Sequence, residues 1–397
     1  MISSSNSLDF PLKLLNPSFD SELVDVLNDL EKLRHWHGFR AEIPTNLGQQ
    51  LQSIFHMLES LGSARIEGNH TILSDYVESR LAPGLAGHSN PEEELAEIIN
   101  LEKAMAYIDE TVEKDSPLTE QFIRELHQLA VWNLKREGAD TPGRYRQGAV
   151  RIAQSQHCPP PALKVSDYMQ ELLDFINRPD KPKYDLLKIA QAHHRFVWIH
   201  PFDNGNGRTV RLLTYALLIK YGFRVASSGR LLNPTAVFCN DRQCYYQMLE
   251  LANRGTREDR EEDLERWCVY VLGGIQRELS KLDLLLQRDF LHSRILLPAL
   301  GRARERQQIT AAEEKILRFL LEHDEMKAGD LKNLLPQLND NQRSYQMKKL
   351  LDNQLISLLP GKSRIYGLEL VRSPLLRGIT AALEVEGFVG RLNEREF

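Results

Sequence analysis

Twelve consecutive residues, HPFDNGNGRTVR at positions 200–211, combine groups that could transfer a phosphoryl or nucleotidyl group. His200 follows the apolar run 196–199, and a neutral imidazole held there could accept a proton from a hydroxyl near neutral pH. The Gly-Asn-Gly turn at 205–207 lets successive backbone N–H groups face one point. The helix expected to begin there adds unpaired donors and a positive dipole end. These features predict an anion site beside a candidate general base.

Two arginines follow the turn at a spacing that places them together. Arg208 and Arg211 would share the first turn of the expected helix, where two planar guanidinium groups beside backbone amides suit a polyphosphate. Each feature alone has an ordinary interpretation: a structural histidine, a simple turn, and a solvated helix face. Their occurrence within twelve residues favours a site for transfer to a hydroxyl, in which positioning and charge neutralisation do most of the catalysis.

The same stretch resembles the signature of the Fic family, HxFx(D/E)GNGRxxR, and matches every fixed position except 204. The resemblance covers roughly residues 50–255 and implies an all-α core with a β-hairpin flap. Most characterised members of this family transfer AMP from ATP to a protein hydroxyl. By this resemblance His200 would be the base, Arg211 would hold the γ-phosphate, and the other ATP phosphates would be bound by Gly205, Asn206, Gly207 and Arg208.

Asn204 is the departure from the signature, because it takes the place of the carboxylate that binds Mg²⁺. Asparagine offers a carbonyl oxygen but no charge to a hard cation, so the affinity for Mg²⁺ or Mn²⁺ should fall. The neighbouring Asp203 is not expected to substitute, since adjacent loop residues usually point in different directions. The nucleotide phosphates would then carry more of the metal binding. We expect either slower catalysis or a balance that favours the reverse, hydrolytic direction.

An upstream helix at about 50–68 ends in SARIEGN, in which Ser63 and Glu67 share one face. Taken alone this is an ordinary helix end, although a glutamate there is unfavourable against the helix dipole. The segment looks like the (S/T)xxxE(G/N) inhibitory motif of many Fic proteins. That resemblance implies that Glu67 pairs with Arg211 and obstructs the γ-phosphate. In some relatives the same glutamate supports removal of AMP, so Glu67 could also position a water.

In the segment 142–164, apolar and polar residues alternate around Ile152, and a glycine and a triple proline bound this alternation. The pattern predicts a short β-hairpin. In the Fic family the edge of this flap pairs with the target backbone by strand addition. The edge residues chosen here are Val150, Arg151, Ile152 and Ala153. A lid without target contacts is the alternative. Tyr245 and Tyr246 could flank the adenine pocket, with Tyr246 chosen as the contact, and packing of buried tyrosines is the competing interpretation.

The whole chain of 397 residues, with a net charge of −5, has the composition of a soluble globular protein and no global charge for nucleic acid. Its four cysteines have no metal-ligand spacing, which predicts free thiols in a cytoplasmic protein. No signal peptide or membrane span is expected. The expected division is a helical region at 1–90, a catalytic core at 91–257, a helical connector at 258–305, a winged helix-turn-helix at 306–372 and a tail at 373–397.

The winged helix expected at 306–372 carries 11 Lys and Arg against 9 Asp and Glu, a thin basic excess for binding DNA. Docking of a protein partner, or formation of a homodimer, is an equal alternative. The preferred function is an autoinhibited adenylyltransferase that modifies a Ser, Thr or Tyr hydroxyl of a target protein. The alternatives are a nucleotide-sensing Fic domain of a DNA-binding regulator, an enzyme that mainly removes AMP, and transfer of phosphate or phosphocholine.

Overall fold

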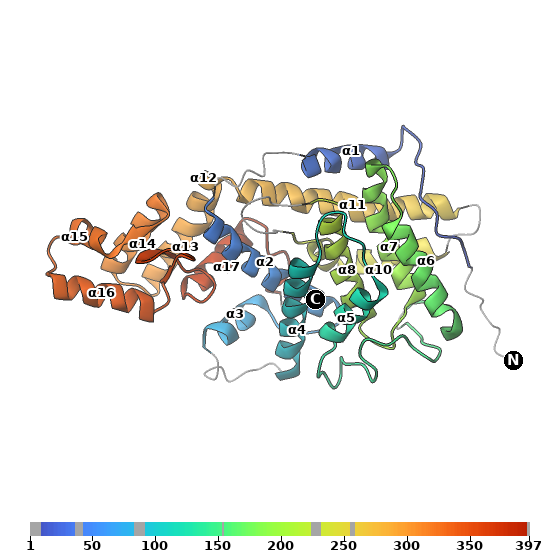
Figure 1. Ribbon diagram of the computed structural model, residues 1–397, viewed down its shortest axis with the longest axis horizontal. Coiled ribbons are helices and arrows are strands. Elements are labelled where there is room, and N and C mark those ends of the chain that lie inside the picture. The colour runs from blue at the N-terminus through green and yellow to red at the C-terminus, as the bar shows by residue number, and fades with distance from the viewer. Residues whose placement is uncertain are drawn as a thin grey trace.

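The computed structural model of the protein describes residues 9–35, 43–82, 92–152, 155–223, 232–254 and 259–394. Helices make up most of these ranges (Figure 1). The first ten are α1 Glu22–His35, α2 Thr45–Ile66, α3 Leu73–Leu81, α4 Glu92–Thr111, α5 Glu120–Ala130, α6 Val165–Asn177, α7 Asp185–Ile199, α8 Asn206–Lys220, α9 Thr235–Cys239 and α10 Arg242–Arg254. The remainder are α11 Arg260–Leu285, α12 Arg288–Phe290, α13 Leu297–Glu305, α14 Ala311–His323, α15 Leu331–Leu334, α16 Asp340–Asp352 and α17 Leu375–Val385. The predicted all-α class is confirmed.

Helices α7 and α8 form the centre of the molecule and pack against each other. Nearly all their residues are buried, which explains why their sequences are apolar around most of the helix rather than along one stripe. Helix α7 ends at Ile199, and the following His200 adopts a left-handed conformation with φ 50° before Pro201. Proline cannot continue the helix, so the chain turns there and begins α8 at Asn206, six residues after His200.

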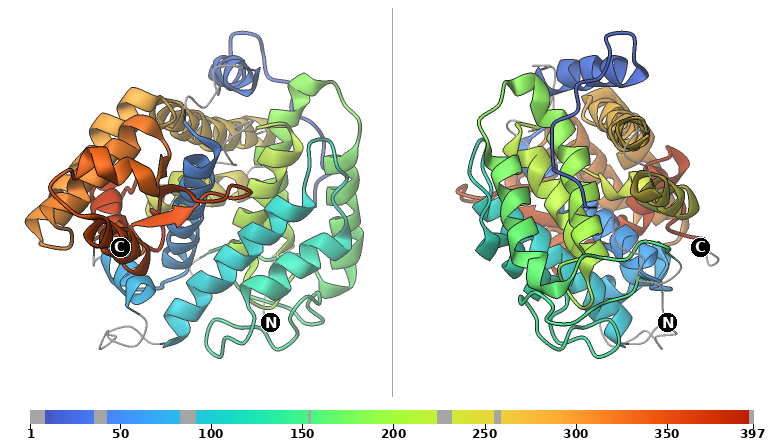
Figure 2. Two further views of the ribbon diagram at one scale, coloured as in Figure 1. Left: turned by 60° about the vertical axis from the view of Figure 1, so that its left-hand side comes forward. Right: turned by 90° about the vertical axis from the view of Figure 1, so that its right-hand side faces the viewer.

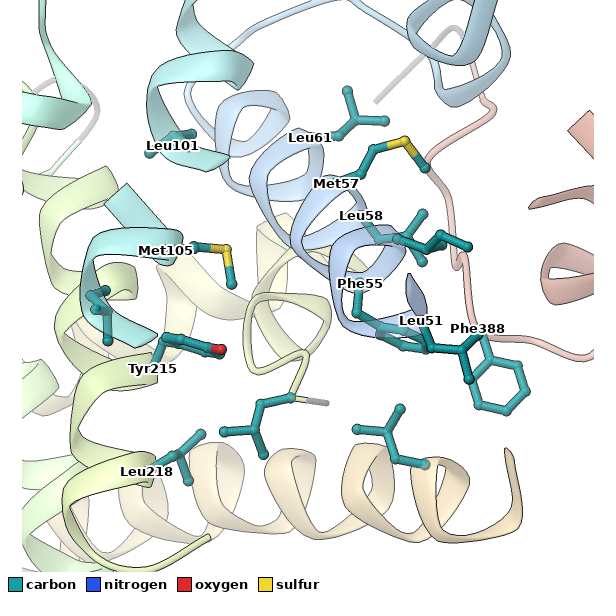
Figure 3. Close-up of a cluster of buried hydrophobic side chains, with 14 of the residues drawn as sticks. Leu51, Phe55, Met57, Leu58, Leu61, Leu101, Met105, Tyr215, Leu218 and Phe388 are labelled. Carbon is teal, nitrogen blue, oxygen red and sulfur yellow. The ribbon is translucent and has the colours of Figure 1, made fainter. Parts of the chain in front are cut away.

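Helix α2 packs against α4, α8 and α9 and contributes a large share of the core. In Figure 3 its side chains lie near Met105 of α4, Tyr215 of α8 and Phe388 of the C-terminal segment. The rings of Phe55 and Phe388 meet edge to face, with centroids 6.3 Å apart. Burying a phenylalanine stabilises a fold by about 1.5–3 kcal/mol, so this contact helps to hold the C-terminal segment against α2.

The segment 142–164 differs from its prediction, because none of its described residues pairs as a strand. Val150 and Ile152 are half-buried, Arg151 is exposed, and Ala153 lies outside the described residues. The buried guanidinium of Arg146 donates to Gly148 O at 2.9 Å and to Pro160 O at 2.5 Å. One side chain therefore joins the two arms of this loop where a hairpin would use backbone hydrogen bonds.

The expected connector and tail are packed parts of the fold. Helix α11 lies along α1, α7 and α10, and its buried Trp267 donates from Nε1 to Ala190 O at 2.8 Å. Helix α17 packs against α13 and α3. Figure 1 shows α11 as one long helix beneath α1, with the C-terminal unit (residues 306–372, orange to red) at one end, and the right-hand view of Figure 2 looks nearly along α11. The amphipathic patterns of both segments match this packing, since their apolar faces are buried.

The C-terminal unit contains a three-stranded antiparallel sheet in the order β1-β3-β2. Its strands are β1 Met326–Lys327, β2 Ile356–Leu358 and β3 Ile365–Leu368, and Ile356 pairs with Leu368. Helices α14 and α16 begin with capping boxes at Thr310 and Asn339, which satisfy their first backbone donors. The expected order of helices followed by a hairpin is present. The winged-helix assignment itself stays a prediction.

None of the helices in the described ranges combines the length and the apolar character needed to cross a membrane.

Candidate active site

The turn between α7 and α8 is braced by its own side chains. Asn206, which is buried, accepts from Phe202 N at 2.9 Å and donates to Phe202 O at 2.8 Å. Gly205 has φ 75°, a left-handed conformation that glycine adopts without strain. Thr209 Oγ1 and Thr209 N both donate to Gly205 O, which closes the first turn of α8. The turn is therefore held in shape by its own hydrogen bonds.

His200 stands at the entrance of this turn with its backbone fixed. Arg146 Nε donates to His200 O at 2.8 Å, and Arg146 N donates to Pro201 O at 2.9 Å. Burial lowers the pKa of His200 to about 4, only partly offset by a hydrogen bond with the Val197 backbone and by the negative charge of Glu67. The imidazole is therefore neutral at pH 7, which is the form that can accept a proton.

The predicted pairing between the upstream helix and the second arginine is present in the structure. Arg211 Nη2 donates to Glu67 Oε1 at 2.7 Å, and Arg211 Nε donates to Ser63 Oγ at 2.9 Å. Burial opposes the ionisation of Glu67, but the charges of Arg211 and Arg208 outweigh it and lower the pKa of this carboxyl. Glu67 is therefore ionised at neutral pH. The two sequence motifs therefore predicted a contact between residues that are 144 positions apart in the chain.

The Glu67 carboxylate also lies directly over the start of α8. A Cβ atom at Gly207 would stand 2.1 Å from Glu67 Oε1, so only glycine permits this approach. The first backbone N–H groups of a helix attract anions, and Glu67 places a negative charge at that position. The carboxylate therefore occupies space beside the predicted phosphate-binding amides.

Arg208 is placed differently from Arg211. It is fully buried, and it donates from Nη1 to Glu97 Oε1 and from Nη2 to Glu137 O, both at 2.7 Å. Glu97, on α4, also accepts from Asn69 Nδ2 at 2.8 Å. Both terminal nitrogens of Arg208 are thus engaged within the protein, and its predicted phosphate contact stays a prediction.

Glu97 and Asn69 are residues of this site that the sequence did not single out. Burial raises the pKa of Glu97, although the Arg208 charge opposes the shift. The available signal was an acidic residue beside the apolar Ile98 on the inner face of α4. A buried carboxylate needs a cationic or hydrogen-bonding partner, but the sequence alone does not name that partner.

Asn204 is used to hold loops together. Its Nδ2 donates to Gly138 O at 3.0 Å, and its Oδ1 accepts from Gly205 N at 2.7 Å. The neighbouring Asp203 is exposed. Within the described ranges, no cluster of three or more His, Cys, Asp and Glu side chains could hold a metal ion. The oxygen atoms at this turn do not fit a dedicated Mg²⁺ site, because Asn204 Oδ1 is neutral and already accepts a hydrogen bond.

The two neighbouring tyrosines on α10 differ in burial. Tyr245 is buried, and its hydroxyl lies 3.0 Å from His193 Nε2. Tyr246 is 42% exposed, and its hydroxyl donates to Ile66 O at 3.3 Å, one residue before Glu67. Tyr246 is therefore partly exposed and bonded next to the carboxylate-bearing residue, where an aromatic ring could contact a bound base, and Tyr245 belongs to the core.

Residues 117–218 match the model of the Fic/DOC family. A curated relative called protein adenylyltransferase Fic, from Nematostella vectensis, is 30% identical over 269 residues, which are 66% of this chain and 54% of the relative. The Aedes aegypti protein of the same name is 32% identical over 205 residues, which are 51% of this chain and 37% of the relative. The chain thus spans about half, or less, of the curated relatives it matches.

Solved structures share the fold at lower identity. The crystal structure of a Fic family protein from Desulfovibrio desulfuricans G20 covers 91% of this chain and 98% of its own, with 19% identity and a TM-score of 0.57. A Fic domain containing signaling protein from Bacteroides thetaiotaomicron covers 67% and 97%, with 21% identity and a TM-score of 0.51. The matched model and the curated relatives identify residues 117–218 as a Fic/DOC domain, and these neighbours show that the chain shares the fold of Fic family proteins.

Proposed function

We propose that the protein is an adenylyltransferase that transfers AMP from ATP to a Ser, Thr or Tyr hydroxyl of a target protein, and that Glu67 inhibits it. The observation that carries this proposal is the ion pair between Glu67 and Arg211, formed over Gly207 at the start of α8. An arginine beside helix N-terminal amides is suited to a polyphosphate. The carboxylate blocks that combination as long as the pair is intact.

The residues divide the chemistry between them. Neutral His200 accepts the proton of the target hydroxyl, whose oxygen attacks the α-phosphorus of ATP. The new P–O bond forms as the bond to pyrophosphate breaks, and pyrophosphate leaves towards the amides at 205–207. Arg211 would bind the γ-phosphate once Glu67 has released it. The Mg²⁺ or Mn²⁺ ion would be held mainly by the nucleotide phosphates, because Asn204 is a poor ligand.

Two surfaces near His200 would receive the substrates. The exposed Tyr246 would flank the adenine base, since aromatic rings stack on nucleobases. The loop containing Val150, Arg151 and Ile152 forms no strand ladder of its own in its described part, so its backbone could pair with an extended target segment. That pairing would place the target hydroxyl near the imidazole.

Removal of AMP is a second candidate activity, favoured by the position of Glu67. Its side chain is 28% exposed, ionised and adjacent to the amides of α8, so it could orient a water towards a modified target. Transfer and removal would then use the same site with Glu67 in opposing roles.

Incubation with ATP labelled at the α-phosphate tests the proposal. Glu67→Gly should raise the label on protein roughly ten-fold or more, since a charge-assisted hydrogen bond of about 1.5–3 kcal/mol is removed. Adding His200→Ala should abolish the label. The matched control is Glu305→Gly, at the end of α13 away from the site, which should match the wild type.

A parallel reaction with label in the γ-phosphate should leave the protein unlabelled, which separates AMP transfer from phosphate transfer. The proposal is wrong if Glu67→Gly gives no more α-label than the wild type, or if the double variant remains as active as the single one.

A further inference from the structure

Arg65 lies on α2 two residues before Glu67, and only 1% of it is exposed. Its Nη1 donates to Thr71 O at 2.9 Å, which spans the turn that contains Glu67. Its Nη2 donates to Glu394 O at 2.6 Å, in the C-terminal segment. One buried guanidinium therefore joins the turn after the inhibitory helix to a part of the chain more than 300 residues away.

The C-terminal segment 388–394 packs against α2 and bonds to the first residues of α3. Leu73 N donates to Leu392 O at 2.9 Å, and Ser74 N donates to Asn393 Oδ1 at 3.1 Å. Phe388, Val389 and Leu392 are buried. Phe388 contacts Phe55 on α2 (Figure 3). The segment thus bonds to the chain on both sides of Glu67.

The start of α2 is also held by the C-terminal unit. Gln50 Nε2 donates to Leu368 O at 2.9 Å, and Gln50 Oε1 accepts from Leu370 N at 2.6 Å. A side-chain amide that satisfies two backbone groups fixes α2 against the end of β3. Both ends of the helix that carries Glu67 are therefore connected to residues beyond 365.

We propose that Arg65 is a positioning residue, which holds Glu67 on Arg211 by fastening the turn 67–71 to the seated C-terminal segment. Without its guanidinium, the buried carbonyl of Thr71 and the backbone carbonyl of the exposed Glu394 lose a charged donor, and the turn is free to open. This inference rests on the proposed function of Glu67 as the inhibitor.

Two disruptive variants and two matched controls test the connection in the full-length protein. Arg65→Gln removes the charged donor, and Leu392→Asp places an unpaired charge where segment 388–394 is buried against the rest of the protein. Arg391→Gln breaks only the exposed ion pair with the Glu394 side chain. Val385→Asp adds the same charge at a position that is 71% exposed on α17.

The first measurement is hydrogen exchange of the backbone amides at 67–71, which does not depend on catalysis. Both disruptive variants should speed this exchange roughly ten-fold, and both controls should leave it unchanged. Exchange at the wild-type rate in Arg65→Gln would overturn the inference whatever the enzyme activity.

The second measurement is labelling of protein with α-labelled ATP. Arg65→Gln should raise the label roughly five-fold or more even though its thermal stability falls, whereas a merely structural residue would lower both. Combined with Glu67→Gly, it should add no further increase. Labelling in Glu67→Gly but not in Arg65→Gln overturns the inference alone. No labelling in Glu67→Gly, with faster exchange in Arg65→Gln, overturns the proposed function and leaves the positioning of the turn supported.

Discussion

A single buried histidine, His127 on α5, fixes two loops of the site. Its ring stacks on Phe202 with the centroids 3.7 Å apart and the planes 4° from parallel. Nδ1 accepts from Gly143 N at 2.9 Å, so Nε2 carries the proton and donates to Asn204 O at 3.0 Å. The neutral ring therefore joins the signature turn to the base of the 142–164 loop. A protonated ring would lose the bond from Gly143, because Nδ1 could no longer accept.

This arrangement predicts a loss of stability in mild acid. Burial lowers the pKa of His127 from 6.5 to about 4, so between these values the unfolded chain binds a proton that the folded chain does not. The free energy of unfolding should therefore fall as pH drops from 6.5 towards 4, by about 1.4 kcal/mol per pH unit for each such histidine. His194, whose pKa burial lowers to about 3, adds to the effect. Urea unfolding at pH 7.5 and pH 5 measures it.

The variant His127→Phe isolates this residue. It should lower the stability at pH 7.5 by about 2–4 kcal/mol, since Gly143 N and Asn204 O lose their partner, and it should make the pH dependence shallower. His323→Phe, at an exposed position on α14, controls for the loss of an imidazole as such. A pH dependence as steep in His127→Phe as in the wild type would contradict the prediction.

The residues of the site that could be predicted from sequence are those that lie close together along the chain. His200, the turn at 205–207 and Arg211 fall within twelve residues, and Ser63 and Glu67 stand one helical turn apart. His127 and Glu97 escaped prediction because their partners are 77 and 111 residues away. A buried polar residue is recognisable in a sequence only when its partner is known, and here the fold supplies the partner.

At the scale of elements, helix α2 carries a buried acid two turns before Glu67. Glu59 is 4% exposed, and both of its oxygens accept from Thr235 N of α9 at 3.0 Å. A small cavity lined by Ser63 and Arg211 adjoins it. Burial raises the pKa of Glu59 to about 8, although the hydrogen bonds from Thr235 oppose the shift. The position of α2 against α9 therefore depends on a carboxyl that is protonated at neutral pH.

Glu59→Gln should remove a pH dependence opposite in sign to that of the histidines. The folded pKa lies above the unfolded value of 4.5, so the stabilisation from the protonated acid is full below pH 4.5 and is lost as pH rises through 8. Relative to the wild type, the neutral amide should gain on the order of 3–5 kcal/mol between pH 4.5 and 8. Denaturant unfolding across this range measures the difference. The exposed Glu110→Gln on α4 should show no such gain, and an equal gain there would refute the assignment to Glu59.

The elements that the sequence predicted best are the long amphipathic helices, because their apolar period extends over several turns. The 142–164 segment was harder. Its alternation covers only about four residues, and Arg146, a buried arginine with five donors, binds carbonyls on both sides of the segment. The apolar faces of α11 and α17 were visible in the sequence, but which surface each would cover depends on the tertiary fold.

At the scale of the whole molecule, the charge of the C-terminal unit is largely balanced within the unit itself. Arg343, on α16, pairs with Asp340 at 2.7 Å, and Lys349 pairs with the buried Glu313 at 3.0 Å. Lys362, in the turn between β2 and β3, pairs with Glu325. Affinity for DNA comes mainly from cations that replace counterions on phosphates, and these three cations already have carboxylate partners. The net charge of −5 adds no long-range attraction.

We therefore expect the protein to bind duplex DNA only at low salt. Retention in a gel-shift assay should vanish by about 150 mM salt, with a salt slope corresponding to roughly two phosphate contacts or fewer. Asp340→Asn, which releases Arg343, should raise the affinity at 50 mM salt about two- to three-fold, and Asp330→Asn, outside α16, provides the matched control. A tight complex at 150 mM salt with a steep slope would refute the expectation and assign DNA to this unit. If the unit instead binds a protein, the exposed Tyr345 and Leu358 are the residues to substitute first. Aromatic and aliphatic side chains dominate the binding energy of such interfaces.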